Sequence, residues 1–498
     1  MTSDASSGDD GPNLDVGGDF DPNFPQTCAS AERARTSIGC EFYPVNPSGS
    51  AGYAVSNVSN EVANVTLADS SGVVQSAAVA AGETHLFVVN THALPETTGI
   101  TPSGWVIESD QVLQVFSFSP EFAGPTADAG LVLPRGAHGI RHRVASYPAT
   151  LENVEDFGTS AAEYVAVIAT ADDTEVTFTL ADPNSVTSAS PDGTLPAADN
   201  AIGASTVTAT LDRLEVLVIA SPAVNPNTGE QDNEITGSLI ESSAAVAVYA
   251  GASITYIPTP PDPTDPPCCG DLILEAIPPT TVLGTSYAGV KFQPLGEEPD
   301  VWRFVGNADG TTVTLTGGLD QVIALDAGEF VDVFTPESFW AEANLPFALV
   351  HFMTSSQYAA VDPFGDEQGP SVATLDCGDV DHPGDPAMTW AYPTDNWLSR
   401  YVFPVDPSVD AAWCHNHVNV VAPATAWAAI TLGGEPLPAG APLGDSGMHF
   451  VRVPVVDLDY ELRAPPGVGV ELTVYGYVSD GSYVYPGGVG VEVVNPEG

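Results

Sequence analysis

The sequence predicts an all-β protein made of four tandem β-sandwich-like repeats of about a hundred residues, with long loops and few short helices. Short runs of β-branched and aromatic residues alternate with polar residues along most of the chain. The 47 glycines and 44 prolines among 498 residues exceed the usual share and indicate many turns. No segment shows a sustained period of 3.6 residues, so we expect helices to be scarce.

The clearest repeated stretch is Val301–Thr316, VWRFVGNADGTTVTLT. Val301, Arg303 and Val305 alternate with Trp302 and Phe304. Asn307 to Gly310 supply turn residues, and a β-branched run follows over 311–316. This pattern predicts a β-hairpin. Weaker copies begin at Tyr53, Tyr164 and Val418.

Each copy contains a V-T-L-like segment, and the spacing of these segments sets the repeat length. Their middle residues are Thr66, Thr177, Thr314 and Thr431, which lie 111, 137 and 117 positions apart. Such periods are too long for solenoids or propeller blades, so each repeat is predicted to be a domain. The expected boundaries are an acidic disordered leader over 1–34 and repeats over 35–134, 135–267, 268–372 and 373–498, with a Pro-rich connector at the end of the second.

The same flanking segments recur around each copy. A short strand precedes it, a Gly-centred turn and another strand follow, and a hydrophobic strand closes the repeat. The closing strands are predicted over 106–119, 239–251, 345–354 and 468–478. Residues 341–343 are a candidate turn of helix.

The charge balance excludes some partners. Sixty-five acidic residues against eleven basic ones give a formal net charge of −54, which would repel nucleic acids and anionic membranes. Lys291 is the single lysine of the chain. No apolar run is long enough to span a membrane. We interpret the acidity as solubility outside the cell, with calcium binding by acidic loops as the alternative.

The first 23 residues lack the basic and apolar regions of a signal peptide. They have the solvated composition of a segment that follows one, so we expect a secretion or lipoprotein signal to precede them and the protein to be extracellular or on the cell surface.

Six cysteines in an acidic, β-rich chain favour disulfides. We predict the pairs Cys28 with Cys40 and Cys377 with Cys414, because each would anchor a segment that is otherwise weakly held. Cys268 and Cys269 could pair with each other, or one could be free.

Several segments in a fixed order carry a resemblance to a known family. They are GCEFYPV at Gly39, ADAGLVLP at Ala127, CCGDLILEAIPP at Cys268, DVWRF and ADGTTVTL from Asp300, GDPAMT at Gly384, NVVAP at Asn419, and YGY with DGSYVYPGG from Tyr475. Over residues 38–488 the chain resembles the IgGFc-binding protein N-terminal domain family, found in exported proteins and lipoproteins of myxobacteria-like bacteria and in a mucin-associated animal protein. The resemblance implies an extracellular, all-β, non-catalytic binding or adhesion protein whose ligand is a protein or a glycan.

The chain departs from the family pattern at two places. Gly251-Ala252-Ser253 stands where members usually have a Gly-His-Glu-Cys-like segment, and the segment Asp271 to Glu275 replaces Asp-His-Leu-Glu-Glu. Any site that depends on those histidines and that cysteine is therefore not expected here.

Two short segments could bind metals. Cys414-His415-Asn416-His417 places two histidines on one face of a strand, which would suit zinc, although a disulfide with two strand histidines is favoured. Asp379, Asp381 and Asp385 lie in one loop, which would suit calcium, but the spacing is not that of an EF-hand and a solvated acidic loop is favoured. We interpret Asp309-Gly310 and Asp172-Asp173 as hairpin turns and not as metal ligands.

The basic residues gather once, in Arg135, His138, Arg141, His142 and Arg143. We favour a surface that forms salt bridges with the acidic body, with an anion or acidic-glycan contact as the alternative. The sequence shows no nucleophile elbow, P-loop, zincin or dinucleotide motif. We therefore predict a binding protein without enzyme activity or cofactor; a structural surface spacer is the alternative, and a metal-dependent hydrolase is less favoured.

Overall fold

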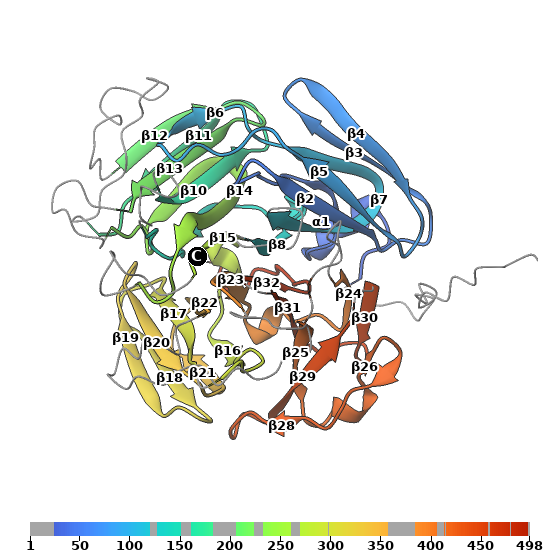
Figure 1. Ribbon diagram of the computed structural model, residues 1–498, viewed down its shortest axis with the longest axis vertical. Helices are drawn as coiled ribbons and strands as arrows, with labels where there is room; N and C mark the ends of the chain where they lie inside the picture. Colours follow the sequence, from blue (N-terminus) through green and yellow to red (C-terminus); the bar gives the residue numbers. More distant parts are fainter. Residues whose placement is uncertain are drawn as a thin grey trace, which may run out of the picture.

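Strands dominate the chain, as predicted for an all-β protein. The structure is a computed structural model that describes residues 24–119, 127–150, 161–182, 206–223, 233–259, 269–296, 298–356, 384–405, 413, 415–456, 459–478 and 480–496. Within these residues the strands form four groups with the same pairing order, which we name unit 1 (39–132), unit 2 (139–276), unit 3 (286–391) and unit 4 (400–486). The units are arranged around a common centre (Figure 1).

Each unit has two antiparallel layers. The first layer begins with the strand that opens the unit: β1 (Gly39–Phe42), β9 (Gly139–Arg143), β16 (Ser286–Gly289) and β24 (Arg400–Pro404). It ends with a pair of strands: β3 (Ala63–Asp69) and β4 (Gly72–Val79), β11 (Thr174–Thr179) and β12 (Thr206–Leu211), β18 (Thr311–Thr316) and β19 (Gln321–Leu325), and β26 (Thr431–Leu432) and β27 (Glu435–Pro436).

The second layer is built around one buried strand and its neighbour: β2 (Ala51–Asn57) and β5 (Thr84–Val89), β10 (Ala162–Ala169) and β13 (Val216–Pro222), β17 (Asp300–Gly306) and β20 (Phe330–Thr335), and β25 (His415–Pro423) and β29 (Met448–Val455). Two short strands extend it, β6 (Gly99–Thr101) beside β13 and β28 (Ala441–Pro442) beside β29. In unit 3 the side chains of both layers share one hydrophobic core, which includes Trp302, Val313 and Phe339. This packing is that of a β-sandwich.

The closing strand of each unit passes from the first layer into the second. It is continuous in β7 (Val106–Ser119) and β14 (Leu239–Thr255), and it is divided into β21 (Phe339–Ala343) and β22 (Phe347–Met353), and into β30 (Asp459–Arg463) and β31 (Glu471–Val478). Pro346 and Pro465 stand at the two breaks, where a residue without an N–H interrupts the ladder. Residues 341–343, expected as a helical turn, are part of β21.

The predicted hairpin over Val301–Thr316 is wrong in its pairing. β17 pairs with β20 and β22, whereas β18 pairs with β19 and β21, so the two strands lie in different layers. β17 is buried along its whole length, while β18 alternates between buried and exposed residues. The turn at Gly310 (φ 74°) therefore connects two sheets and does not close a hairpin.

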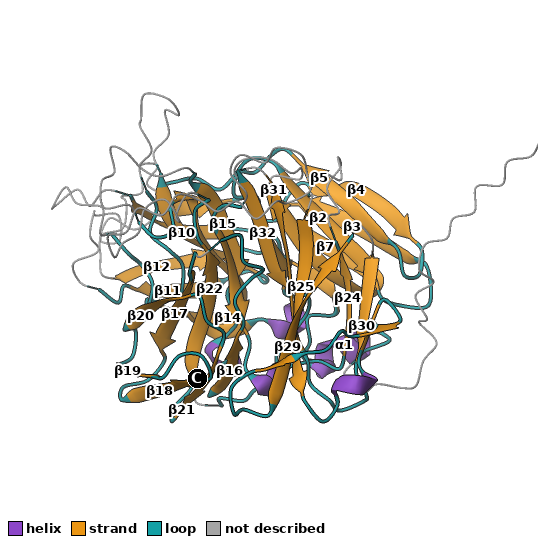
Figure 2. Cartoon of the chain, turned by 60° about the horizontal axis from the view of Figure 1, so that its bottom comes forward, coloured by secondary structure: helices purple, strands orange, loops and turns teal. Residues whose placement is uncertain are grey.

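Four short strands occupy the centre where the units meet (Figure 1), and Figure 2 shows two of them, β15 and β32, with strands on both sides. These axial strands are β8 (Asp128–Val132), β15 (Asp271–Ala276), β23 (Ala387–Ala391) and β32 (Gly481–Pro486). Each pairs with the closing strand of its own unit and contacts the axial strands on either side. β15 thus pairs with β14 across the expected boundary at residue 267, and β23 with β22 across that at 372.

The two ends of the described chain close the ring. Ser37 N donates to Val489 O at 2.7 Å, Val491 N donates to Arg35 O at 2.6 Å, and Thr36 forms an antiparallel bridge with Gly490. Helix α1 (Cys28–Ala34) precedes this ladder, held by the disulfide between Cys28 and Cys40. The expected disordered leader over 1–34 therefore overlaps an ordered helix.

A glycine–proline contact recurs at the start of units 1, 2 and 3. A Cβ atom on Gly39 would lie 2.3 Å from Cβ of Pro134, and Gly139 and Gly284 face Pro279 and Pro393 in the same way. Each proline precedes a 3₁₀ turn: η1 (Arg135–Ala137), η2 (Thr280–Val282) and η4 (Thr394–Asn396). Only glycine permits this close approach, so the contact marks the same joint in successive units.

Candidate functional site

A surface cleft lies beside the ring closure, between α1, β1, β7 and η1. Its volume is about 300 Å³, and its lining includes the Cys28–Cys40 disulfide, Glu32, Glu108 and Arg135. That volume lies at the lower end of the range of small-ligand pockets. The cleft is therefore the candidate binding site on the described surface.

Charged side chains that line this cleft form ion pairs. Glu41 binds Arg135 at 3.0 Å, and Arg213 binds Glu108 at 3.2 Å. Burial alone would raise the pKa of Glu41, but hydrogen bonds from Tyr43 and Arg135 outweigh burial and lower it. Burial and the bond to Glu41 raise the pKa of Tyr43 to about 12. The charges of Glu41, Glu108 and Arg135 at the cleft are thus paired.

The five basic residues from Arg135 to Arg143 do not form one surface patch. Arg135 and Arg141 pair with acidic residues, Arg141 with Glu241 at 3.7 Å, as the salt-bridge interpretation predicted. Arg143 is buried and donates to Gly237 O at 2.8 Å.

His138 and His142 from the same cluster are buried as well. Burial lowers the pKa of each to about 4, so both are neutral at pH 7. His142 lies within hydrogen-bonding distance of Ile277 O (3.1 Å) and Gly139 O (3.3 Å). These histidines are structural, and the proposed anion contact has no support from them.

Buried polar groups link every pair of adjacent units. Gln114 joins unit 1 to Gly487 O of unit 4 at 2.6 Å, and Tyr249 of unit 2 donates to Tyr43 O of unit 1 at 3.1 Å. Arg303 of unit 3 donates to Ser146 O and Glu234 of unit 2 at 2.6 and 2.8 Å, while it also binds Asp332. Since removing one partner from such a bond is costly, the units hold each other in place.

The single lysine belongs to a buried ion cluster near units 3 and 4. Lys291 Nζ lies 3.0 Å from Asp300 and 3.1 Å from Glu298, and His351 lies 2.6 Å from Asp300. Burial would raise the pKa of Asp300, but Lys291 and His351 outweigh it and lower that pKa to about 2. Burial lowers the pKa of His351 despite the neighbouring carboxylate.

A histidine beside an aspartate is a common catalytic pair, but here the imidazole is enclosed. His351 stacks between Phe292 and Trp302, with ring centroids 3.8 and 3.6 Å away. The backbone carbonyl of Lys291 accepts hydrogen bonds from Arg452 (2.8 Å) and Asn419 (3.3 Å) of unit 4. The cluster therefore positions the joint between two units and leaves no room for a substrate beside the imidazole.

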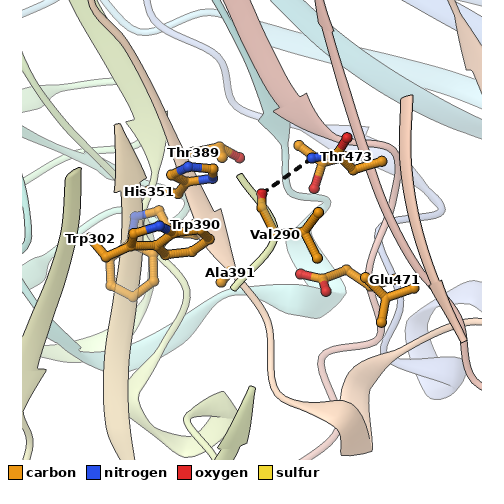
Figure 3. A pocket seen from close by; sticks show the side chains of 10 residues that line it. Val290, Trp302, His351, Thr389, Trp390, Ala391, Glu471 and Thr473 are labelled. Carbon is orange, nitrogen blue, oxygen red and sulfur yellow. Dashed lines mark hydrogen bonds between the residues drawn. The ribbon is translucent and has the colours of Figure 1, made fainter. Parts of the chain in front are cut away.

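A small cavity borders this cluster (Figure 3). Trp302, Trp390 and Thr389 line it from unit 3, and Glu471 and Thr473 line it from unit 4. Burial raises the pKa of Glu471 to about 8. The cavity has about 10 Å³ open to the centre of a water molecule, which is far too little for an organic ligand.

At the axis, one carboxylate contacts all four axial strands. Asp128 of β8 accepts the amide N–H of Ala129 at 2.8 Å, of Leu274 and Met388 at 3.2 Å each, and of Val484. Burial raises the pKa of Asp128 well above its usual range, although the four amides act in the opposite direction.

Asp385 was expected in a solvated acidic loop, with calcium binding as the alternative, and the solvated surroundings are wrong for this residue. It is 1% exposed next to the axial strands, and its amide donates to Ser482 Oγ at 2.7 Å. Burial raises the pKa of Asp271, and the charge of Asp385 raises it further. Residues 379–383 of the expected loop lie outside the described residues.

The zinc alternative for the Cys414–His417 segment gains no support. His417 stacks against Tyr475, burial lowers its pKa to about 4, and Cys414 lies outside the described residues. In the part of the chain that the structure describes, no three His, Cys, Asp or Glu side chains are grouped to hold a metal ion. Asp309-Gly310 and Asp172-Asp173 lie in turns, with left-handed φ values at Gly310 and Asp173. Neither is the predicted hairpin turn, because β17 does not pair with β18 and β10 does not pair with β11.

One of the two predicted disulfides is confirmed. Cys28 and Cys40 are bonded, with Cα atoms 5.5 Å apart. Cys269 is also disulfide-bonded. Cys268, Cys377 and Cys414 lie outside the described residues, so the pair Cys377 with Cys414 stays a prediction.

The sequence analysis did not identify four titratable residues whose pKa is shifted by buried surroundings: Asp128, Asp300, His351 and Glu471. The sequence offers one signal for this group: Lys291 is the single lysine of a strongly acidic chain, and Asp300 is its ion-pair partner. The isolated Asp128 and Glu471 give no comparable signal.

Comparison with protein families shows the family to which the chain belongs. A family model described as IgGFc binding protein matches residues 128–476, which is well over half of the chain. The chain belongs to this family. The IgGFc-binding match runs from the first axial strand, β8, into β31 and so includes three of the four axial strands described. Members are typically extracellular binding proteins, and the resemblance noted in the sequence is confirmed.

The other comparisons add little to the IgGFc-binding assignment. No curated protein shows significant similarity to the chain. One solved structure, two B repeat units (B1B2) of the collagen binding protein CNA of Staphylococcus aureus, aligns at 11% identity over 86% of this chain and 93% of that chain, with a TM-score of 0.08. A TM-score this low does not indicate a shared fold. Among the described residues, no helix has the length and apolar character needed to cross a membrane.

Proposed function

We propose that this chain is an extracellular, non-catalytic binding protein that engages a protein or glycan ligand through its loops or its interunit surfaces. Membership of the IgGFc-binding family carries the proposal. The closed ring supports it, because four units linked by buried bonds present a fixed surface, and a preorganised surface loses little entropy on binding.

The bonds that the buried ionisable groups form with one another also favour binding over catalysis. Lys291, Asp300 and His351 bind one another, and Arg303 joins two units. Chemistry on a substrate would require at least one such group to face an open pocket. The metal-dependent hydrolase therefore stays the least favoured alternative, and calcium is not required by the proposal.

The cleft beside α1 is the region of the described surface that we propose for ligand contact. It can receive a side chain or a sugar ring of a partner. With a net charge of −54, the protein will associate faster with a basic partner surface than with an acidic one.

Binding should be tested with the purified chain against immunoglobulin G Fc fragments, a glycan array and an extracellular protein array, with Fab fragments as a comparison. Saturable binding to any of these classes is expected. Uniformly negative results in calcium-containing buffer would reject the proposal in favour of a structural spacer.

The contribution of the cleft can be tested with a matched pair of charge reversals. Glu32→Arg changes an exposed carboxylate that lines the cleft, and Glu435→Arg changes an exposed carboxylate in unit 4. If the cleft binds the ligand, Glu32→Arg should change the affinity about tenfold or more and Glu435→Arg should not. Equal effects would place the contact elsewhere.

A structural spacer is the second candidate. A spacer is expected to be extended, whereas the axial strands and the chain ends close these units into a ring. Scattering that gave an elongated particle, or self-assembly into filaments, would favour the spacer.

A further inference from the structure

The second layer of every unit has an outer strand in the same position: β5, β13, β20 and β29. In units 2 and 4 a further short strand covers the edge of that strand, since β6 pairs with β13 and β28 pairs with β29. β6 belongs to the connection between β5 and β7, so a segment of unit 1 covers the edge of unit 2. In unit 3, the described residues provide no such strand, and β20 pairs with β17 alone.

The turn before β20 shows which of its backbone groups face away from β17. Gly306 N donates to Glu329 O at 2.8 Å, and residues along an antiparallel strand point alternately to one side and to the other. The N–H and C=O groups of Phe330, Asp332 and Phe334 therefore point away from β17. In the part of the chain that the structure describes, no group is hydrogen-bonded to these outward N–H and C=O groups.

Unit 2 shows how the equivalent groups are satisfied. The turn before β13 contains the same bond, donated by Ala169 N at 3.1 Å, so Val216, Val218 and Ala220 are the outward residues of β13. The first two face β6, and Ala220 N donates to Thr98 Oγ1 at 3.1 Å. An extended segment thus bonds all three outward residues of the strand in this position.

The edge of β20 is also more open than that of β5. In unit 1, Gln75 Nε2 donates to Val88 O at 2.6 Å, so a side chain of β4 occupies part of the edge. The sheet order β20–β17–β22–β23 places β20 on the side of unit 3 away from the axial strand (Figure 1). An edge with a row of unpaired backbone groups is a template for one more strand.

The charges around β20 select the kind of segment that fits. Asp326 and Glu329 precede the strand, Glu337 follows it, and all three are exposed. The carboxylate of Asp332 is already held by Arg303 at 2.8 Å. Acidic residues at both ends favour a segment with basic ends. A second copy of the chain is a poor occupant, because each copy carries a net charge of −54.

We propose that β20 binds an extended segment of a partner protein, which joins the sheet as an additional strand. The segment has β-branched or apolar residues in its middle, beside the half-buried Phe330, Val331 and Phe334, and Lys or Arg at its ends. In strand addition, main-chain hydrogen bonds give affinity and alternate side chains give specificity. This surface is separate from the cleft beside α1, so the proposal does not rest on ligand binding at that cleft.

Hydrogen exchange of the free chain tests whether the edge is open. The amides of Asp332 and Phe334 should exchange about tenfold or more faster than those of Val331 and Val333, which face β17. The amide of Val218, which faces β6, is the control and should exchange slowly. Slow exchange of the two outward amides in a dilute monomer would mean that the chain covers its own edge and would overturn the proposal. Protection that appears only at high protein concentration would assign the edge to a second copy and would also overturn it.

Three synthetic peptides test the chemistry of the partner. The peptide KKTVTITVKK has the proposed pattern, EETVTITVEE reverses its end charges, and a form of the first peptide with N-methyl groups on its six central residues lacks the main-chain donors. The basic peptide should bind and slow the exchange of Asp332 and Phe334. The acidic peptide should bind about tenfold more weakly, and the N-methylated peptide should not bind. Absence of binding by the basic peptide, or equal binding of any two peptides, would overturn the proposal.

A matched pair of proline variants tests the site of binding. Phe334→Pro removes one outward N–H of β20 and places a ring at its open edge, where sheets tolerate proline. Val88→Pro makes the same change at the equivalent position of β5. Phe334→Pro should weaken the basic peptide about tenfold or more, whereas Val88→Pro should change its affinity less than about twofold. Equal losses in the two variants would overturn the proposal. If Phe334→Pro does not fold, the exchange of the outward amides with and without the basic peptide decides the same question in the wild-type chain.

Discussion

The carboxylate of Asp128 accepts a hydrogen bond from the backbone amide of Met388 at 3.2 Å, although the two residues are 260 positions apart in the chain. The same carboxylate reaches amides in the other axial strands. The centre of the ring thus depends on one acidic side chain of unit 1.

Replacement of Asp128 should destabilise the whole ring. Asp128→Ala leaves several buried amides without an acceptor, and we expect a loss of roughly 3 kcal/mol or more in the free energy of unfolding, measured by denaturant titration. Asp128→Asn keeps one acceptor oxygen and should lose less. Asp445→Asn, which removes one exposed charge, is the control. An Asp128→Ala variant as stable as this control would contradict the role of Asp128.

Stability should fall as the pH rises through 8, and Glu471 should contribute to this fall. Its pKa is about 8 in the native state, above the value of 4.5 expected when unfolded, so the native state retains a proton that the unfolded state has lost. The contribution is full below pH 4.5 and disappears as the pH passes 8. Glu471→Gln cannot ionise, so its Tm relative to wild type should increase from pH 5.5 to pH 8.5. A constant difference would mean that Glu471 titrates normally.

The buried histidines should make the protein less stable at acidic pH. His138, His142 and His417 have a pKa of about 4 in the native state, below the value of 6.5 expected when unfolded. Only the unfolded state gains protons between these values, so stability should fall as the pH decreases from 6.5 to 4. His142→Gln does not titrate, and its deficit relative to wild type in chemical denaturation should therefore be smaller at pH 5 than at pH 7. An unchanged deficit would mean that His142 is protonated in the native state.

Salt should raise the Tm. A net charge of −54 repels itself, and at 0.01 M ionic strength the Debye length of about 30 Å lets this repulsion act between units. Melting curves in low salt, sodium chloride and calcium chloride of matched ionic strength separate screening from specific binding, because a bound ion stabilises further. Identical curves in the two salts would remove calcium binding, and no response to either would show that the repulsion is negligible.

Peptide mapping without reduction should recover Cys377 linked to Cys414 as well as Cys28 linked to Cys40. The second pair is present in the structure. The first would close a loop of 37 positions (414 − 377) and could add about 3 to 4 kcal/mol of stability. A free thiol at Cys377 or Cys414 would refute this pairing.

Local pattern predicted the strands well but not their partners. Alternation placed β18 and the closing strands β7 and β14 correctly, because it reports which residues face a core. It could not show that β17 and β18 lie in different layers, because the same residue types form hairpin turns and turns that connect two sheets. The axial strands were missed as a group because each is short and is surrounded by residues distant in sequence.

Composition was misleading at buried polar residues. Asp385 and Arg143 were assigned to solvated surroundings because charged residues are seldom buried. Asp385 contacts unit 4, and Arg143 donates to Gly237 O of its own unit and to Asn307 O of unit 3. No local signal distinguishes these two residues from surface residues. Lys291 was noticed for its rarity, while its partners Asp300 and His351 required the structure.

The antiparallel bridge between Thr36 and Gly490 also determines how the molecule would respond to mechanical tension. The two segments are antiparallel, so a pull on the segment that follows residue 490 peels the hydrogen bonds of the ladder apart one at a time. A pull on the other end passes through the Cys28–Cys40 disulfide to β1 and does not load residue 36. Peeling requires less force than shearing all of them together. Under stretch the first event would be separation of this seam, while the axial strands still hold the four units together.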